Sequence, residues 1–275
     1  MDQKNSWVVI TGASRGVGVA IAEEFAKKNA NLILIARSED GLKKTCEQVE
    51  KLGGKAHAIP FDLAKTSEIE NLVGKIYKLA PHVDVLVNNA GLEKYCFFTK
   101  YQRKDITSIL SVNLIAPMEL TRLLLPGMLD REKGHIINIS SLNGRTPEIY
   151  NSIYDASKGG IDSWTEALRQ ELHKTGVKVS SVILGPVRDT GMIYNMGVKY
   201  PAIVGSCTGR SAADAIIKCT LKYKSRVIVN SMPFKPFILI NVLFPRLFDA
   251  IARLIGLTKT NIEKVKRRMK ADQGK

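Results

Sequence analysis

The chain has 275 residues, of which 45% are hydrophobic and 24% charged. This length and composition are typical of a globular protein with one large domain, and no internal repeat or low-complexity tract is visible. The formal net charge is +15, but Lys and Arg are dispersed except at residues 258–275, which hold seven of them against two Asp or Glu. No aromatic platform is interleaved with the basic residues, so we expect no nucleic-acid partner.

The cysteines and the N-terminus indicate where the protein works. Cys46, Cys96, Cys207 and Cys219 are widely spaced and match no metal-ligand pattern, which indicates thiols kept reduced in a reducing compartment. The first residues lead almost at once into an apolar run, without the long apolar stretch and small-residue cleavage site of a signal peptide. We therefore expect a cytoplasmic protein without a metal centre.

Short apolar runs alternate with longer amphipathic segments. The apolar runs are rich in Val and Ile, as strands buried on both faces are: 7–12, 32–37, 56–61, 84–91, 135–141, 178–185 and 226–231. The amphipathic segments have helical periodicity: 17–29, 39–52, 66–80, 105–130, 152–175 and 211–223. This alternation predicts an α/β fold, with a single doubly wound Rossmann-type parallel sheet of about seven strands and helices on both faces.

A glycine-rich loop, Thr-Gly-Ala-Ser-Arg-Gly-Val-Gly over residues 11–18, follows the first predicted strand and opens the first predicted helix. Glycines let the backbone approach a pyrophosphate, which the positive end of the helix stabilises. The residues expected to hold a dinucleotide here are Gly12, Ser14, Arg15, Gly16, Val17 and Gly18. The alternative interpretation is a plain strand-to-helix turn.

Tyr154 and Lys158 lie four residues apart in a predicted helix, so they stand on one face of it. A free phenol has a pKa of about 10, and a nearby ammonium lowers that pKa by favouring the phenolate. The pair can therefore exchange a proton with an alcohol or a carbonyl oxygen. The same spacing also occurs by chance on surface helices.

Further motifs follow in order along the chain. They are Asp62-Leu63, Asn88-Asn89-Ala90-Gly91, Asn113, Ser141 placed 13 residues before Tyr154, and Gly185-Pro186 with Thr190. With these motifs, the chain resembles the short-chain dehydrogenases/reductases over roughly residues 6–231. The resemblance implies an oxidoreductase that interconverts a ketone or aldehyde and an alcohol by hydride transfer with a nicotinamide dinucleotide.

The resemblance also implies catalytic roles. Tyr154 is the acid–base, Ser141 positions the carbonyl oxygen, and Lys158 lowers the pKa of the tyrosine and bonds the nicotinamide ribose. Asn113 holds a water that links Lys158 to solvent. Of the adjacent Ser140 and Ser141 only one can enter the site, because neighbouring strand residues face opposite sides.

The end of the second strand predicts which dinucleotide is used. Enzymes that use NAD generally carry an acidic residue there, which bonds the ribose 2′-hydroxyl. Here the strand ends in Arg37 and Ser38. Arg37 and Arg15 are placed to pair with a 2′-phosphate, and Ser38 can donate a hydrogen bond to it. We therefore predict NADP(H), with the alternative that both arginines are solvated loop residues.

By the same resemblance, other residues contact the cofactor. Asp62 and Leu63 flank the adenine, and Asn88 supports the ribose region unless its amide mainly ties strands together. The nicotinamide is contacted by three residues after the sixth strand: Pro186, Val187 and Thr190.

Residues 1–231, including a substrate lid at 188–210, are expected to form the catalytic domain, followed by an apolar extension with a basic tail at 232–275. The lid residues Met192, Ile193, Tyr194 and Met196 suit a hydrophobic substrate. The extension has no uncharged span long enough for a transmembrane helix. It can pack over the protein's own cleft, form a dimer interface, or lie on a membrane surface with the basic tail near anionic lipid.

The leading functional hypothesis is an NADPH-dependent reductase of a lipophilic ketone or aldehyde. The alternatives are a 3-oxoacyl thioester reductase and a non-catalytic NADP(H)-binding sensor. The resemblance further implies a homo-oligomer, with contacts through residues 105–130 and 152–175.

Overall fold

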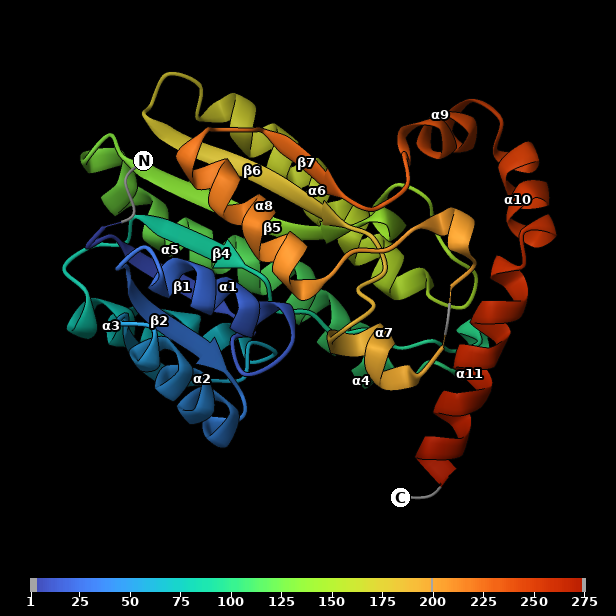
Figure 1. The fold of residues 1–275 in the computed structure, drawn as a ribbon, viewed down its shortest axis with the longest axis horizontal. Helices are drawn as coiled ribbons and strands as arrows, with labels where there is room; N and C mark the ends of the chain where they lie inside the picture. Colours follow the sequence, from blue (N-terminus) through green and yellow to red (C-terminus); the bar gives the residue numbers. More distant parts are fainter. Residues whose placement is uncertain (1–3, 199, 274–275) are drawn as a thin grey trace.

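The computed structural model describes residues 4–198 and 200–273, and in it the chain forms one seven-stranded parallel sheet (Figure 1). The strands lie in the order β3-β2-β1-β4-β5-β6-β7. Their bounds are β1 (Trp7–Thr11), β2 (Asn31–Ala36), β3 (Lys55–Pro60), β4 (Val85–Asn88), β5 (Gly134–Ser141), β6 (Val177–Leu184) and β7 (Arg226–Val229). The predicted doubly wound parallel sheet is confirmed.

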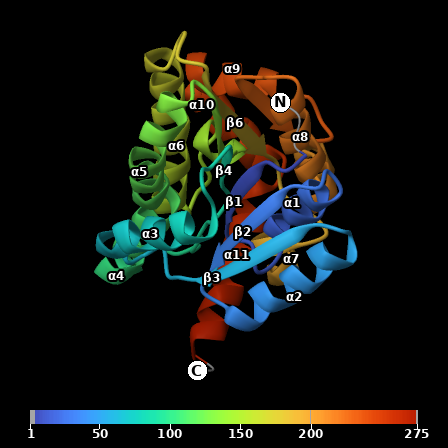
Figure 2. The ribbon, with the colours of Figure 1, turned by 90° about the vertical axis from the view of Figure 1, so that its left-hand side faces the viewer.

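The central strands are buried on both faces, which explains their nearly continuous apolar sequences. In β1, Val8 and Ile10 point into one hydrophobic core, whereas Val9 points into the other. Successive side chains of a strand face opposite sides, so each face needs its own layer of helices. Figure 2 shows these two layers on either side of the sheet.

One layer of helices covers the face of the sheet toward which Val8 and Ile10 point. It includes the helix that follows the glycine loop. Its helices are α1 (Val17–Ala26), α2 (Glu39–Lys51) and α8 (Gly209–Leu221). Phe25, Leu42 and Ile216 from these three helices are fully buried in one core.

The other layer contains η1 (Thr66–Glu68), α3 (Ile69–Leu79), η2 (Phe98–Lys100), α4 (Arg103–Leu110), η3 (Ser111–Ile115), α5 (Ala116–Asp130), η4 (Leu142–Gly144) and α6 (Ser152–Glu171). The predicted helix at 105–130 is therefore not one regular α-helix, because η3 is a π-helical turn. The run from Arg103 to Asp130 is long and apolar enough to span a membrane. Leu120, Leu124 and Met128 are buried in the core, however, so we regard it as a core helix.

The strand order reverses between β1 and β4, which is where sheets of this type bind ligands. The loops after β1, β4 and β6 and the end of β5 meet at this edge. They bring together Gly12, Asn89, Gly185 and Ser141. The glycine loop and the predicted catalytic residues thus belong to one site.

The remaining elements lie beyond this edge. Residues 188–210, predicted to form a lid, contain α7 (Gly191–Met196) and η5 (Ala202–Val204). Residues 232–275, the C-terminal extension, contain α9 (Lys235–Leu243), α10 (Pro245–Leu254) and α11 (Leu257–Gln273). Figure 1 shows the extension as a separate column of helices at the right of the sheet. Asn261, Lys264 and Val265 of α11 are buried. The extension therefore packs on the catalytic domain through α11.

Candidate active site

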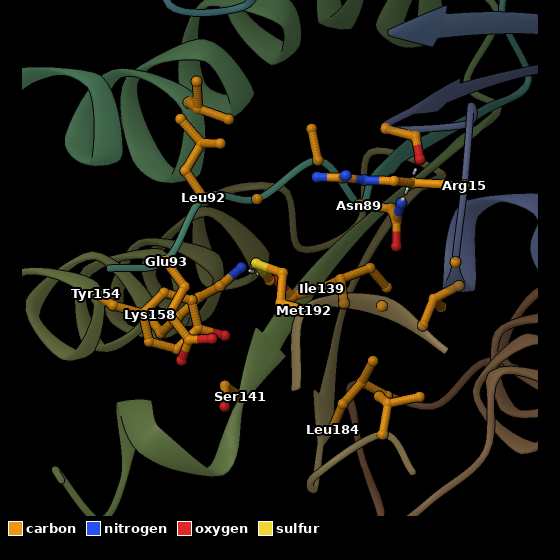
Figure 3. Close-up of a pocket in the computed structure, with 18 of the residues that line it drawn as sticks. Arg15, Asn89, Leu92, Glu93, Ile139, Ser141, Tyr154, Lys158, Leu184 and Met192 are labelled. Carbon is orange, nitrogen blue, oxygen red and sulfur yellow. Dashed lines mark hydrogen bonds between the residues drawn. The ribbon is translucent and has the colours of Figure 1, made fainter. Parts of the chain in front are cut away.

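A cleft of about 400 Å³ runs along the carboxyl ends of the strands. Figure 3 shows Arg15 and Asn89 on one side of it and Tyr154, Lys158 and Glu93 on the other. Most residues expected from the sequence line it: Gly12, Ser14, Arg15, Gly16, Val17, Arg37, Ser38, Asp62, Leu63, Ser141, Tyr154, Lys158, Pro186, Val187 and Thr190. Three expected residues, Gly18, Asn88 and Asn113, are not part of its lining.

The glycine loop packs closely against neighbouring backbone, so two of its glycines have no room for a side chain. Gly12 has φ +69°, and a Cβ added to it would lie 2.8 Å from Ala90 Cα. A Cβ on Gly18 would lie 2.2 Å from the Gly12 carbonyl oxygen. The first turn of α1 carries no acidic residue, so nothing there opposes an anion at the helix N-terminus. This cradle fits a dinucleotide pyrophosphate.

Arg15 and Arg37 carry positive charge into the cleft. Both are exposed, and neither guanidinium forms an ion pair within residues 4–198 and 200–273. Ser38 caps α2 by accepting a hydrogen bond from the Gly41 N–H at 3.1 Å, which leaves its own O–H able to donate. Two available cations and a hydroxyl donor fit the 2′-phosphate of an NADP-type dinucleotide.

The adjacent residues Asn88 and Asn89 have different surroundings. Asn88 is buried, and its Nδ2 donates to Asn138 Oδ1 on β5 at 2.8 Å, so it ties two strands together. Asn89 lines the cleft instead, and its Nδ2 donates to the Thr11 carbonyl at 2.9 Å. The direct cofactor contact expected of Asn88 is therefore not supported by its position.

Asn113 lies in the π-turn η3, where its side chain is fully engaged. Its Oδ1 accepts from Leu92 N–H at 2.7 Å, and its Nδ2 donates to the Leu92 carbonyl and to Ser157 Oγ, both at 2.9 Å. A Cβ on Gly91 would lie 3.7 Å from Asn113 Oδ1 and 3.9 Å from Lys158 Nζ. Asn113 thus anchors the loop after β4 close to Lys158, and its role in a water relay stays a prediction.

Lys158 is almost fully buried, and its ammonium donates to the Ile139 carbonyl at 2.8 Å. Burial lowers the pKa of Lys158 to about 8, although the carboxylates of Asp162 and Glu93 act in the opposite direction. Its Nζ lies 5.8 Å from the centroid of the Tyr154 ring. The predicted proximity of the two side chains is therefore present.

Tyr154 is also buried, at 7% exposure. Burial raises the pKa of Tyr154 above its usual value, the Glu93 carboxylate raises it further, and a hydrogen bond with Ser141 lowers it. The lowered pKa that the sequence predicts for Tyr154 is therefore not found in the structure. The reason is that desolvation of the phenolate, together with the Glu93 carboxylate, outweighs the hydrogen bond with Ser141.

Ser141 and Ser140 differ in what holds them. Ser140 Oγ donates to the Lys158 carbonyl at 3.2 Å, which ties it to α6. Ser141 Oγ accepts from the Asn143 N–H at 3.2 Å, and the Asn143 amide in turn donates to Asp155 at 2.9 Å. Burial raises the pKa of Asp155 to about 8, against the lowering effect of the Asn143 amide. Ser141 is thus held in the cleft by a polar chain from α6.

Glu93 adds an acidic group to the catalytic end of the cleft. Its carboxylate accepts from Asn151 Nδ2 at 2.8 Å. Burial raises the pKa of Glu93, while the Lys264 ammonium and the Asn151 amide lower it.

The ammonium of Lys264, on α11, is fully buried and acts electrostatically on Glu93. Lys264 Nζ donates to Tyr95 Oη at 2.7 Å and to Glu148 at 3.2 Å, and it also bonds Tyr200 Oη. It lies 4.2 Å from the Tyr95 ring centroid and 4.0 Å from that of Tyr200. Since Tyr200 lines the cleft, the extension supports the substrate side of the site directly.

The family model described as short chain dehydrogenase matches residues 6–199. The chain belongs to this family. It is therefore an oxidoreductase of the short-chain dehydrogenase/reductase class.

Two curated relatives and a solved structure show how closely this short-chain dehydrogenase resembles known members. It is 42% identical over 268 residues to a ketoacyl reductase, HetN, from Nostoc sp., covering 96% of this chain and 93% of the relative. It is 31% identical over 221 residues to a very-long-chain 3-oxoacyl-CoA reductase from Mus musculus, covering 78% and 67%. A metagenomic short-chain oxidoreductase in complex with NADP superposes with a TM-score of 0.73 at 29% identity, covering 83% and 98%.

In this short-chain dehydrogenase, four residues to which the sequence patterns assign no role also line the cleft: Asn89, Glu93, Asn143 and Tyr200. Alternation along β4 would have favoured Asn89, because Asn88 pairs in register with the buried Asn138. No feature of the sequence around Glu93 predicts that this residue lines the cleft. Ile193, expected in the lid, has a side chain outside the described part of the structure.

Proposed function

We propose that this short-chain dehydrogenase reduces the keto group of lipophilic 3-oxoacyl thioesters with NADPH. The observation that carries the proposal is one cleft lined both by Arg15 and Arg37 and by Tyr154, Ser141 and Lys158. Figure 3 shows Arg15 on the opposite side of it from Tyr154 and Lys158. The similarity to HetN, which extends over nearly the whole chain, favours an acyl thioester over a general ketone.

The cofactor is NADP(H), and the residues present fit it. Gly12 and Gly16 line the cleft with positive φ angles that favour glycine, in the loop that would hold the pyrophosphate, and Arg15 and Arg37 supply the charge for the 2′-phosphate. When bound, the cofactor supplies the hydride for the carbonyl carbon. The protein supplies orientation and the proton.

In the proposed mechanism, Tyr154 Oη donates a proton to the carbonyl oxygen, and Ser141 Oγ hydrogen-bonds that oxygen and fixes its position. Reduction needs the neutral phenol, and the raised pKa of Tyr154 keeps it protonated at neutral pH. Lys158, whose ammonium is already held by the Ile139 carbonyl, provides the nearby positive charge that favours the phenolate left behind.

The proposal is tested by NADPH consumption with 3-oxoacyl thioesters, simple lipophilic ketones and sphingoid ketones. We expect turnover with the thioesters to exceed turnover with the ketones. Higher turnover with simple ketones would favour a general carbonyl reductase. Binding of NADPH without turnover of any carbonyl would favour the non-catalytic sensor.

We also propose that the protein contacts membranes through α9 and α10. Large apolar side chains point outward from these helices and the short turn between them, with exposures from 51% for Leu247 to 87% for Leu254. The set is Leu239, Val242, Leu243, Phe244, Leu247 and Leu254. Exposed Lys235, Arg246 and Arg253 flank them. An apolar helix face with basic neighbours is typical of binding at an anionic bilayer surface.

Sedimentation with phosphatidylglycerol vesicles tests this contact. The wild-type protein should sediment with them at low salt, and Phe244→Ser with Leu247→Ser should reduce the bound fraction. Leu52→Ser is the matched control, because Leu52 is an exposed leucine at the end of α2. Wild-type protein that stays in the supernatant would contradict the membrane proposal.

A further inference from the structure

A second cavity, here called the extension chamber, lies between the catalytic domain and the C-terminal extension. Its volume is about 350 Å³, within the usual range for ligand sites of about 300–1,000 Å³. Its walls come from the 142–149 segment, η5 and helices α9, α10 and α11. The extension therefore builds a cavity that the seven-stranded sheet alone does not have.

The walls of the extension chamber are mainly apolar. Phe234 and Phe248 are at most 8% exposed, and Phe234 stacks on Phe237 with ring centroids 5.4 Å apart. Val204 from η5 completes this side, in one hydrophobic cluster with Leu142 and Phe234. The polar part consists of Asn143, Thr146, Thr258 and Asn261 with three charged residues. Of these, Asp249 and Arg253 are exposed, and the Glu148 carboxylate is paired with the Lys264 ammonium at 3.2 Å. Such a lining favours an aliphatic ligand over a charged one.

The extension chamber and the cleft share a wall. Leu142, Asn143 and Pro186 line both cavities. Asn143 is also the residue that hydrogen-bonds Ser141. The chamber therefore lies beside the Ser141–Tyr154 end of the cleft, on the substrate side.

We propose that the extension chamber binds the aliphatic chain of the substrate while the carbonyl lies between Ser141 and Tyr154. The chain crosses from one cavity to the other beside Leu142 and Pro186. This inference rests on the proposed function for its substrate, and it narrows the substrate class to long-chain acyl compounds. Short acyl groups would leave the chamber unfilled and gain nothing from it.

A matched pair of alanines in α10 allows a direct test. Ala252 lines the chamber, whereas Ala250 is exposed on the same helix and is not part of the chamber wall. Ala252→Phe should fill the chamber, and Ala250→Phe should add the same side chain outside it. Binding of the fluorescent fatty acid parinaric acid is measured first, because this readout does not depend on turnover.

We expect Ala252→Phe to weaken parinaric acid binding at least tenfold, since each buried methylene contributes roughly fourfold in affinity. Ala250→Phe should bind like wild type. Reduction of 3-oxopalmitoyl-CoA should fall in Ala252→Phe relative to reduction of acetoacetyl-CoA, and Ala250→Phe should leave both rates unchanged. Equal binding by all three proteins would overturn the proposal.

A small substitution covers the case in which Ala252→Phe fails to fold. In Ala252→Cys, parinaric acid should slow maleimide labelling of the new thiol, and in Ala250→Cys it should not. If parinaric acid leaves the labelling rates of both thiols unchanged, the proposal that the extension chamber binds the aliphatic chain is overturned. If parinaric acid protects the thiol of Ala252→Cys but the wild type reduces no 3-oxoacyl thioester, the extension chamber is confirmed as a site for aliphatic chains. The proposed reduction of 3-oxoacyl thioesters is then wrong.

Discussion

Lys158 lies beside the Tyr154 ring, with Nζ 5.8 Å from the ring centroid, while it donates its hydrogen bond to the Ile139 carbonyl. The lysine thus acts on the tyrosine through space and is positioned by β5. Burial opposes ionisation of both side chains. The neutral phenol of Tyr154 is therefore the favoured form, as a proton donor in reduction requires.

The lowered pKa of Lys158 predicts a pH-dependent stability. The pKa of Lys158 is about 8 in the folded protein against an ordinary value of 10.5, so between these pH values the unfolded chain binds more protons. The free energy of unfolding should therefore rise with pH across this window, by up to about 3 kcal/mol from this residue. Urea unfolding of wild type and Lys158→Met at several pH values measures it.

Lys158→Met removes this titration, so the variant should gain stability relative to wild type as the pH falls from about 10.5 to about 8. It also loses the hydrogen bond to Ile139, which shifts the difference equally at every pH in that range. A difference between the two proteins that does not change with pH would contradict the assigned pKa.

Arg37 should determine the choice of dinucleotide. Arg37→Ala removes a charge-assisted hydrogen bond to the 2′-phosphate, and we expect the KM for NADPH to rise roughly tenfold at low salt, less at high salt. The KM for NADH should hardly change, because NADH lacks that phosphate. Arg103→Ala, an exposed arginine outside the cleft, is the control. A parallel rise for both dinucleotides would count against the role of Arg37.

Glu93 should affect the pH dependence of catalysis. Its carboxylate raises the pKa of Tyr154, second only to burial. Alcohol oxidation needs the phenolate, so its kcat/KM rises with pH toward the pKa of the tyrosine. Glu93→Gln should move this rise to lower pH. Glu119→Gln, a half-buried glutamate of α5 that pairs with Arg122 outside the cleft, should leave the profile in place. An unchanged profile for Glu93→Gln would show that the charge of Glu93 does not act on Tyr154.

Lys264 should stabilise the docking of α11. Lys264→Met leaves Glu148 and the hydroxyls of Tyr95 and Tyr200 without their buried partner, which we expect to lower the free energy of unfolding by about 3 kcal/mol. Chemical unfolding checks this value.

Two further variants control the Lys264 experiment. Exposed Lys266→Met should be neutral. Adding Glu148→Gln to Lys264→Met should restore part of the stability, because it removes the uncompensated carboxylate. A neutral Lys264→Met would mean that the buried cluster does not hold the helix.

The sheet and the cofactor end of the cleft could be predicted from the sequence because their signals are local. Buried parallel strands require continuous apolar runs such as that of β1, and the tight turn at Gly12 requires a residue without a Cβ. The spacing of Tyr154 and Lys158 is likewise a property of one helix. These features depend on few long-range contacts.

The other features depend on contacts between distant segments. The π-turn at Asn113 accompanies hydrogen bonds to Leu92, 21 residues away. The buried ammonium of Lys264 meets Tyr95 across 169 positions. The pKa of Tyr154 depends on how deeply the fold buries it, which helical spacing does not show. The extension chamber arises only when α9, α10 and α11 pack on the catalytic domain.

The most direct test of the central claim is NADPH oxidation with 3-oxopalmitoyl-CoA by wild type and Tyr154→Phe. We predict turnover by the wild type and a loss of about 10²- to 10⁴-fold in the variant, with NADPH binding unchanged, because only the proton donor is removed. Full turnover by Tyr154→Phe, or no turnover by a wild-type protein that binds NADPH, would contradict the claim that Tyr154 donates the proton in reduction of a 3-oxoacyl thioester.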